Sequence, residues 1–264
     1  MSRKDEYYNK AKQQGYRARS AYKLQQLDET AGLLGEGRTV VDLGAAPGGW
    51  LQVAAERVGE RGTVVGVDRQ RIDPLSDPEP AVEYVRGDMT DESTKDQIRD
   101  VVGGADGGRG GPVDVVVSDM APNMTGEYDL DHARSVHLVR QAFEVATDLL
   151  DSGGDFAAKV FDGQDLDDLI ADIEPEFEYV REVRPDASRD SSSELYLVAK
   201  HRLTAPVREG DVVEVTIEDI GEEGDGIAKV EGFTVFVSGV EEGETLDVRV
   251  GDVKPRYAFA QPAE

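Results

Sequence analysis

The sequence predicts a mostly parallel, doubly wound α/β sheet with one antiparallel strand, followed by a small C-terminal β-barrel. Two observations support the sheet. Short Val-rich runs alternate with helical stretches from Gly37 onward, and several of these runs end in glycine or aspartate. A third observation supports the barrel, because residues 207–262 contain only short strand-like runs separated by glycine-containing turns.

Five apolar runs are the expected parallel strands, since the helical stretches between them are typical of βαβ units. These runs are RTVVDLG (38–44), GTVVGVD (62–68), VEYVRGD (82–88), VDVVVSD (113–119) and GGDFAAKVF (153–161). Residues 5–34 are expected to be helical up to about Gly35, and a long amphipathic helix is expected from about Asp129 to Leu150.

The end of the sheet is expected to be a hairpin. A short acidic helix, QDLDDLIADI (164–173), precedes two more strands, EFEYVREVR (176–184) and SSELYLVAK (192–200), and no helical pattern separates these two strands. One of them should therefore run antiparallel to the rest of the sheet. Residues 202–207 are expected to link the sheet to the barrel.

The glycine-dense segment VVGGADGGRGGP (101–112) is expected to be a flexible connection. It lacks the Gly-Lys-Ser/Thr ending of a phosphate-binding P-loop, so we assign it no chemistry.

Composition excludes several kinds of site. The chain of 264 residues has no cysteine and only three scattered histidines, which argues against disulfides, thiolate–metal sites and a histidine metal centre. The N-terminus has no apolar signal segment, and no run of 18 apolar residues occurs. We therefore expect a cytoplasmic protein with no membrane contact and no metal.

The charge is strongly asymmetric along the chain. The formal net charge is -26, and arginine supplies 20 of the 29 basic residues, a composition typical of a salt-loving organism. Residues 1–23 nevertheless carry seven basic and two acidic side chains. This basic arm is either an exposed, frayed end or a contact for an anionic partner such as RNA. Concentrated salt screens bulk repulsion, so local charge matters more than the total.

The segment DLGAAPGGW (42–50) predicts a cofactor loop, because glycines at a strand-to-helix turn let a ligand approach the backbone. It lacks the G-x-G-x-x-G spacing of dinucleotide enzymes, which argues against hydride transfer. The next strands end in Asp68, Asp88 and Asp119. An acidic residue at that edge can accept hydrogen bonds from a ribose, and S-adenosylmethionine fits an acidic lining better than a pyrophosphate does.

Each of these residues also has a structural interpretation. An aspartate that follows a strand often closes a turn or caps a helix, and this alternative is strongest for Asp88. Trp50 either packs in the core or contacts the cofactor from beside the loop.

Lys159 lies within an otherwise apolar strand, where an unpaired lysine is costly. Strand alternation places Ala157, Lys159 and Phe161 on one face, near the carboxyl end of the strand. Asp119 should emerge at the same edge, so an ion pair with Lys159 is expected, and Glu194 could join them. The alternative is a purely structural ion pair.

Five segments resemble the FtsJ/RrmJ (RlmE) family of ribosomal RNA 2'-O-ribose methyltransferases. They are GYRARSAYKL, DLGAAPGGW, SDMAPNMTG, KVFDG and SSELYLVAK, and the resemblance runs from about Gly15 to His201. It implies a Rossmann-like S-adenosylmethionine-dependent methyltransferase domain over 1–202, with 1–34 as a basic helical arm. The implied catalytic tetrad is Lys23, Asp119, Lys159 and Glu194. The implied cofactor-binding positions are Gly44, Pro47, Gly48, Gly49, Trp50, Asp68, Asp88 and Asp119.

The chemistry makes these residue types sensible, because a ribose hydroxyl must lose or share its proton to attack a methyl group. An ordinary lysine has a pKa of about 10.4, which burial or a neighbouring cation lowers and carboxylates raise. Two roles for Lys159 therefore stay open. A neutral amine would act as the base, whereas an ammonium would orient the hydroxyl and stabilise developing alkoxide.

Residues 203–264 resemble a TRAM domain, a small β-barrel appended to RNA-modifying enzymes. This segment holds five basic and fifteen acidic residues, which puts an RNA role based on charge in doubt. Phe233, Phe236, Tyr257 and Phe259 could stack on bases. A barrel core also needs aromatic side chains, and we expect core packing for each of the four.

The resemblance implies methyl transfer to a uridine of large-subunit (23S) ribosomal RNA, with ribosomal RNA or the large ribosomal subunit as partner. Two alternatives stay open, namely 2'-O-methylation of transfer RNA and a non-catalytic RNA-binding role in ribosome assembly. The sequence predicts no oligomeric state.

Overall fold

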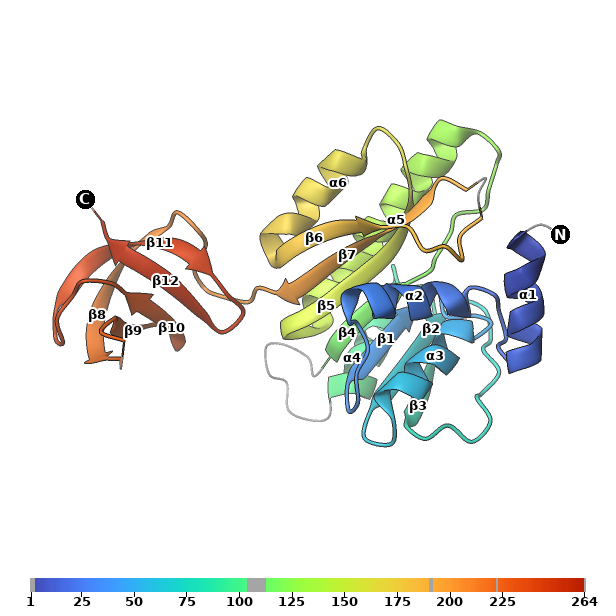
Figure 1. Ribbon diagram of the computed structural model, residues 1–264, viewed down its shortest axis with the longest axis horizontal. Helices are drawn as coiled ribbons and strands as arrows, with labels where there is room; N and C mark the ends of the chain where they lie inside the picture. The colour runs from blue at the N-terminus through green and yellow to red at the C-terminus, as the bar shows by residue number, and fades with distance from the viewer. Residues whose placement is uncertain (1–2, 104–112, 190–191, 222, 264) are drawn as a thin grey trace.

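The computed structural model describes residues 3–103, 113–189, 192–221 and 223–263 of the chain. Most of the glycine-dense connection expected at 101–112 lies outside the described residues. Figure 1 shows two bodies, a sheet covered by helices and a separate barrel at the C-terminal end.

The larger body contains a seven-stranded sheet with the order β3-β2-β1-β4-β5-β7-β6. All neighbouring pairs in the run from β3 to β5 are parallel, and β7 is antiparallel to both β5 and β6. The fold class and the antiparallel strand are thus confirmed. The strands are β1 (Thr39–Leu43), β2 (Thr63–Asp68), β3 (Ala81–Arg86), β4 (Val113–Ser118), β5 (Leu150–Phe161), β6 (Phe177–Val183) and β7 (Glu194–Arg202).

Helices cover both faces of this sheet, because the central strands are apolar on both sides. One face packs against α2 (Ala21–Ala31) and α3 (Gly49–Val58). The other packs against α4 (Glu92–Gly103), α5 (Tyr128–Leu149) and α6 (Leu166–Ile173), and the 3-10 helix η1 (Glu174–Glu176) follows α6. The two faces of β5 separate as predicted, with Phe156, Ala158 and Val160 in one core and Ala157 in the other.

The predicted single helical stretch over 5–34 is wrong, since the structure has two helices there. Helix α1 (Arg3–Gln14) ends before Gly15, which has a φ of 79°, and residues 15–20 are not helical. Helix α2 ends at Ala31, where Gly32 adopts the left-handed conformation and donates its N–H to the carbonyl of Asp28. The break allows the chain to cross the N-terminus of α3 between the two helices.

Helix α1 is docked against the body of the protein. Ala11 is buried together with Tyr22 and Ala187, and the rings of Tyr7 and Tyr22 lie 5.4 Å apart. Lys10 places its ammonium 4.6 Å from the centre of the Tyr22 ring, a cation–π contact. Of the two alternatives for the basic arm, the frayed end is therefore wrong for this helix, whereas the contact with an anionic partner stays a prediction.

The smaller body is a closed five-stranded barrel with the order β10-β12-β11-β8-β9. Its strands are β8 (Val212–Ile220), β9 (Gly226–Val230), β10 (Phe233–Val237), β11 (Thr245–Val253) and β12 (Tyr257–Pro262). Its core consists of small and branched side chains, and Phe233 packs against it. The expected core packing is wrong for Phe236, Tyr257 and Phe259, which project outward from β10 and β12.

The barrel follows β7, whose antiparallel direction determines where the barrel lies. Because β7 ends where the parallel strands begin, the barrel attaches at the amino edge of the sheet, and α1 lies at the other end of the molecule (Figure 1). Lys254 forms a 2.8 Å ion pair with Glu178 of β6, and Arg208 contacts Glu176 at 3.2 Å. Among the residues described, no helix has the length and apolarity needed to cross a bilayer.

Candidate active site

Lys159 and Asp119 meet at the carboxyl edge of the sheet, as predicted. The Lys159 ammonium donates to the Asp119 carboxylate at 2.8 Å and to the Asp119 main-chain carbonyl at 2.6 Å. Lys159 lies near the end of β5, and Asp119 directly follows the neighbouring strand β4, so strand pairing fixes their separation. The Lys159 side chain is only 8% exposed, which limits competition from water for this ion pair.

A second ion pair joins Lys23 of α2 to Glu194 at the start of β7, with 2.6 Å between Nζ and Oε1. Both side chains are largely buried. Burial raises the pKa of Glu194, but the charge of Lys23, the hydrogen bonds from Lys23 and Ser188 and the charge of Lys159 together hold the pKa below its ordinary value. The four residues thus form two lysine–carboxylate pairs, and Glu194 pairs with Lys23 rather than with Lys159.

Tyr196 lies between the two ion pairs, and no separate signal in the sequence indicated its role. Its hydroxyl donates to the Asp119 carboxylate at 2.6 Å, and the Lys23 ammonium lies 5.9 Å from the centre of its ring. Burial, followed by the nearby negative charge of Asp119, raises the pKa of Tyr196 well above its usual range. Tyr196 therefore acts as a hydrogen-bond donor that orients Asp119.

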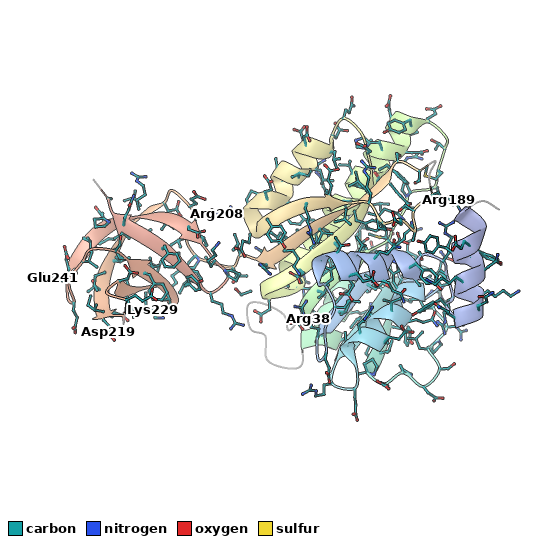
Figure 2. The ribbon with its side chains drawn as sticks, in the orientation of Figure 1. Arg38, Arg189, Arg208, Asp219, Lys229 and Glu241 are labelled. Atoms are coloured by element: carbon teal, nitrogen blue, oxygen red, sulfur yellow. The ribbon has the colours of Figure 1, made fainter. Side chains whose placement is uncertain are left out.

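A pocket of about 610 Å³ opens on Lys23, Lys159 and Glu194. Arg19 and Arg189 lie on other parts of its wall, so cations flank the two ion pairs. Figure 2 shows Arg189 at the end of the sheet that is remote from the barrel. The pocket is large enough for a nucleotide and has positive charge for a phosphate.

The predicted cofactor loop joins β1 to α3 and approaches two other segments closely. Gly44 has a φ of 82°, and a Cβ built there would lie 2.4 Å from Cγ of Met120. Gly48 has a φ of 104°, and its Cβ would lie 2.8 Å from the Arg17 guanidinium. These two positions require glycine, whereas Gly49 and Pro47 complete the turn into α3.

Arg17 holds this loop from outside, a role that the charge count did not predict. Its guanidinium donates to the carbonyls of Pro47, Asp73 and Pro74. One cation of the basic arm therefore stabilises the cofactor loop. Arg19 instead donates to the Ala187 carbonyl at 2.6 Å and has one buried guanidinium nitrogen without a partner among the described residues, beside the pocket.

Asp68 and Trp50 both support the loop from within the protein. The Asp68 carboxylate accepts hydrogen bonds from the Ala46 N–H at 2.9 Å and the Gln70 N–H at 2.7 Å. Trp50 is 3% exposed and donates its ring N–H to the Ser20 carbonyl at 2.8 Å. Its side chain therefore packs in the core, which leaves its main chain in the first turn of α3 as the part that can face a ligand.

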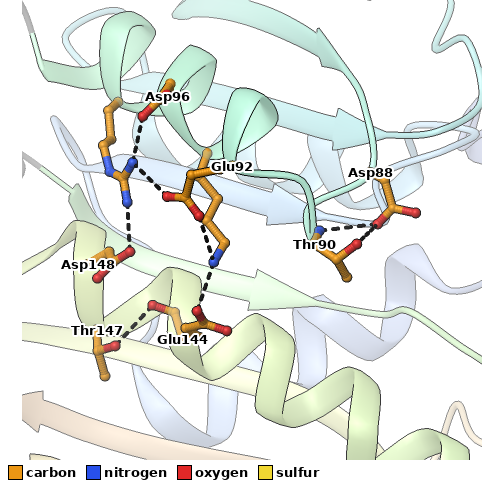
Figure 3. Close-up of polar contacts among 9 residues, drawn as sticks. Asp88, Thr90, Glu92, Asp96, Glu144, Thr147 and Asp148 are labelled. Atoms are coloured by element: carbon orange, nitrogen blue, oxygen red, sulfur yellow. Dashed lines mark hydrogen bonds and ion pairs between the residues drawn. The ribbon is translucent and has the colours of Figure 1, made fainter.

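Asp88 lies two residues beyond β3 and forms a turn, as its structural interpretation required. Its carboxylate accepts hydrogen bonds from the main-chain N–H and the hydroxyl of Thr90, at 3.1 and 2.9 Å (Figure 3). These bonds, aided by Arg69 at 3.6 Å, hold the pKa of Asp88 below its ordinary value. A cofactor role for Asp88 stays a prediction.

Asp42 is a buried carboxylate that sequence reasoning missed. It lies in β1 beneath the cofactor loop, is 1% exposed, and neither carboxylate oxygen has a hydrogen-bond partner among the described residues. Burial, followed by the negative charges of Asp119 and Asp68, raises the pKa of Asp42 well above its ordinary value of 3.8. The available signal was an acidic residue within the otherwise apolar run TVVDL.

Comparison with known proteins places these residues in a family context. A model of FtsJ-like methyltransferases matches residues 16–202, and a model of the TRAM domain matches residues 206–263. The chain is 86% identical to "Ribosomal RNA large subunit methyltransferase E" of Haloarcula marismortui, and the match covers 100% of both chains. It is 67% identical to the protein of the same name from Natronomonas pharaonis, again over 100% of both.

A solved ribosomal RNA methyltransferase from Plasmodium falciparum has the same fold as the larger body. It matches with a TM-score of 0.60 and 24% identity, covering 71% of this chain and 98% of that one. Within the described ranges, no group of three or more His, Cys, Asp or Glu side chains is arranged to hold a metal ion.

Proposed function

The chain belongs to the FtsJ-like methyltransferase family, and from that premise we propose that it transfers a methyl group from S-adenosylmethionine to the 2'-hydroxyl of a ribose in RNA. The proposed target is a uridine of large-subunit ribosomal RNA. The relatives are named as large-subunit ribosomal RNA methyltransferases, which supports ribosomal RNA rather than transfer RNA as the substrate. The same names support a cytoplasmic site of action.

The observation that carries this proposal is the convergence of Lys23–Glu194 and Lys159–Asp119 on one pocket. The four residues are far apart in the sequence, and both lysines, Lys23 and Lys159, line the same cavity. Carboxylates that only neutralised lysines would not require an open pocket, whereas a reaction centre does.

The cofactor loop fits S-adenosylmethionine on two observations. The unpartnered oxygens of Asp42 lie beneath the loop, where they can accept hydrogen bonds from the ammonium group of the methionine moiety. The N-terminus of α3 has no side-chain cap among the described residues, so its first main-chain N–H groups, from Gly49 onward, can donate to the carboxylate of the methionine moiety. Asp68 lies at the end of β2, where it would meet the ribose hydroxyls.

When bound, S-adenosylmethionine supplies a methyl group on a sulfonium, which an oxygen nucleophile attacks in line. Lys159 would react as the neutral amine, with its two N–H groups on Asp119 and its lone pair on the ribose 2'-hydroxyl, and would take that proton as the O–C bond forms and the methyl–sulfur bond breaks. Asp119 positions Lys159 through two hydrogen bonds, and Tyr196 holds the Asp119 carboxylate. Lys23, kept in place by Glu194, stabilises negative charge that develops on the attacking oxygen.

Arg19 and Arg189 would bind the phosphates that flank the target nucleotide, because both line the pocket. The unpartnered guanidinium nitrogen of Arg19 is suited to a phosphate oxygen.

The experiment that tests the proposal is incubation with methyl-labelled S-adenosylmethionine and separated ribosomal subunits, followed by mapping of the label. We expect label at a ribose 2'-oxygen of a large-subunit uridine. Label found only in transfer RNA would overturn the substrate, and RNA binding with no uptake of cofactor would favour a non-catalytic assembly factor.

A further inference from the structure

Two large apolar side chains are exposed on the wall of the reaction pocket, at the end of the segment between β4 and α5. Met124 is 61% exposed and Tyr128 is 56% exposed, and both line the pocket together with Lys23 and Lys159. Apolar side chains that are grouped beside a cavity indicate a binding surface, because water must otherwise cover them. Met124 and Tyr128 are called the apolar rim below.

The ring of Tyr128, the first residue of α5, is held in place through its hydroxyl. This hydroxyl donates to the main-chain carbonyl of Asp162 at 2.5 Å. Asp162 directly follows β5 and is fixed in turn, because its N–H donates to the Ser193 carbonyl and its carboxylate accepts from Arg184, both at 2.8 Å. The ring is thus immobilised while much of its surface stays open. Such a ring loses little conformational entropy when a flat ligand packs on it.

The buried carboxylate of Asp131 fixes the segment that carries the rim. One of its oxygens accepts from the N–H and the hydroxyl of Thr125, both at 2.9 Å, and the other accepts from the N–H of Gly126 at 3.0 Å. Asp131 is buried, so water competes little for these bonds. Met124 directly precedes Thr125, and the same segment begins at Asp119. The apolar rim and the carboxylate that holds the proposed base therefore belong to one ordered connection.

The charges around the pocket indicate which part of a nucleotide the rim can accept. Arg19 and Arg189 line the pocket from the segments that precede α2 and β7, and they suit phosphates. The exposed carboxylates of Glu127 and Asp129 instead flank Tyr128 in the sequence and disfavour a phosphate there. An uncharged, flat group is left as the occupant of the rim. In a nucleotide this group is the base.

We propose that the Tyr128 ring, aided by Met124, stacks on the base of the nucleotide whose ribose is methylated, and this rests on the function proposed above. A base that lies on Tyr128 cannot also be stacked within an RNA helix. The protein therefore takes its target nucleotide unpaired and unstacked, and Tyr128 positions the ribose by holding the base.

The test is photo-cross-linking of a short oligo(4-thiouridylate) to the full chain in concentrated KCl, which screens phosphate contacts but affects stacking little. We expect a cross-linked peptide that contains Met124 or Tyr128. In Tyr128→Ala the cross-link to Met124 should fall about tenfold, since stacking contributes severalfold or more per base. The matched control is Tyr179→Ala, which removes an exposed tyrosine of β6 opposite Lys200 and should leave the yield unchanged.

The variant Tyr128→Phe separates the ring from its hydroxyl. It keeps the stacking surface and loses the hydrogen bond to Asp162, so its cross-link to Met124 should stay within about twofold of the unaltered protein. An equal loss in Tyr128→Phe and Tyr128→Ala would show that only the hydrogen bond matters and would overturn the inference. So would cross-links confined to peptides outside residues 121–130, or an unchanged yield in Tyr128→Ala.

Kinetics give a second readout with the RNA that accepts the methyl label. Tyr128→Ala should raise KM for this RNA about tenfold and leave S-adenosylmethionine affinity unchanged. An RNA with an abasic ribose at the target position should abolish the difference between Tyr128→Ala and the unaltered protein. Because cross-linking needs no methyl transfer, failure of the proposed reaction would be recognised separately, as a lack of label with the cross-link intact.

Discussion

Strand β5 contributes one residue to each of two lysine–aspartate pairs, Lys159 toward the carboxyl edge of the sheet and Asp155 toward the amino edge, and the two pairs differ in access. At the carboxyl edge Lys159 meets Asp119 at 2.8 Å beside the 610 Å³ pocket. At the amino edge Lys200 meets Asp155 at 2.7 Å, and the Asp155 side chain is only 1% exposed. Similar residues at similar distances thus occur in an open and in a closed setting.

The closed pair is saturated by its neighbours. Asp155 also accepts from Arg38 at 3.1 Å and from the His201 main-chain N–H at 3.2 Å, and Lys200 donates to the Gly32 carbonyl. Lys159 has hydrogen bonds only to Asp119 among the described residues, so a further position is free for a substrate. Unused hydrogen-bonding capacity next to a cavity distinguishes a reactive pair from a structural one.

The largest expected effect is on the open pair. Lys159→Ala should lower kcat for methyl transfer about 100-fold to 10,000-fold, because it removes the group that takes the proton. Binding of S-adenosylmethionine, measured by calorimetry, should be nearly unchanged. The matched control is Lys95→Ala, which removes another largely buried lysine, paired with Glu144 at 2.9 Å outside the site (Figure 3). Equal kcat for Lys159→Ala and the control would refute the assignment.

The closed pair should respond in stability instead. Lys200→Ala leaves the Asp155 charge buried without its main partner, so we expect a loss of about 3–5 kcal/mol in the free energy of unfolding, measured in urea. The kcat per folded molecule should stay unchanged. Arg61→Ala breaks an exposed pair with Glu36 and should cost less than about 1 kcal/mol. A Lys200 variant with normal stability and low kcat would remove the distinction between the pairs.

Asp42 is a third case beside the two lysine–aspartate pairs, because it is a buried carboxyl group that has no hydrogen-bond partner among the described residues. Its folded-state pKa lies above the ordinary value of 3.8, so the stability present below pH 3.8 is lost as the pH rises and the carboxyl ionises. Asp42→Asn should therefore raise the free energy of unfolding by about 1–3 kcal/mol at neutral pH, with no gain below pH 3.8.

The same variant should weaken S-adenosylmethionine binding, by about tenfold in calorimetry, because the amide cannot supply the negative charge that a carboxylate offers to an ammonium group. A variant that is both less stable at neutral pH and normal in cofactor affinity would contradict the assignment of Asp42.

Local patterns were sufficient for the sheet and for one ion pair of the site. A lysine in an apolar strand and an aspartate at the end of the neighbouring strand predicted the contact between Lys159 and Asp119, because strand pairing is regular. The place of Lys23 depends on how α2 packs on the sheet, so only the family resemblance indicated it. Asp42 lay within the quoted loop motif, but its lack of partners among the described residues is a property of the packed structure.

Two predictions from the sequence were wrong, and the first concerned the core packing of the barrel aromatics. Alternation divides each strand into two faces but does not identify the inner one. A closed barrel of five strands has a narrow interior, which Val and Ala fill, so the larger rings at positions 236, 257 and 259 are left outside. The unbroken helix expected over 5–34 failed because the docking of residues 15–20 beside α3 is a tertiary contact.

The close approach of Gly44 to Met120 makes the two halves of the reaction centre share a wall. A methyl group at position 44 would push against the Met120 side chain, and Met120 directly follows Asp119. Any larger residue at position 44 would therefore shift the segment that holds Lys159 as well as the loop that receives the methyl donor. The contact between Gly44 and Met120 thus couples the position of the cofactor loop to the position of Asp119.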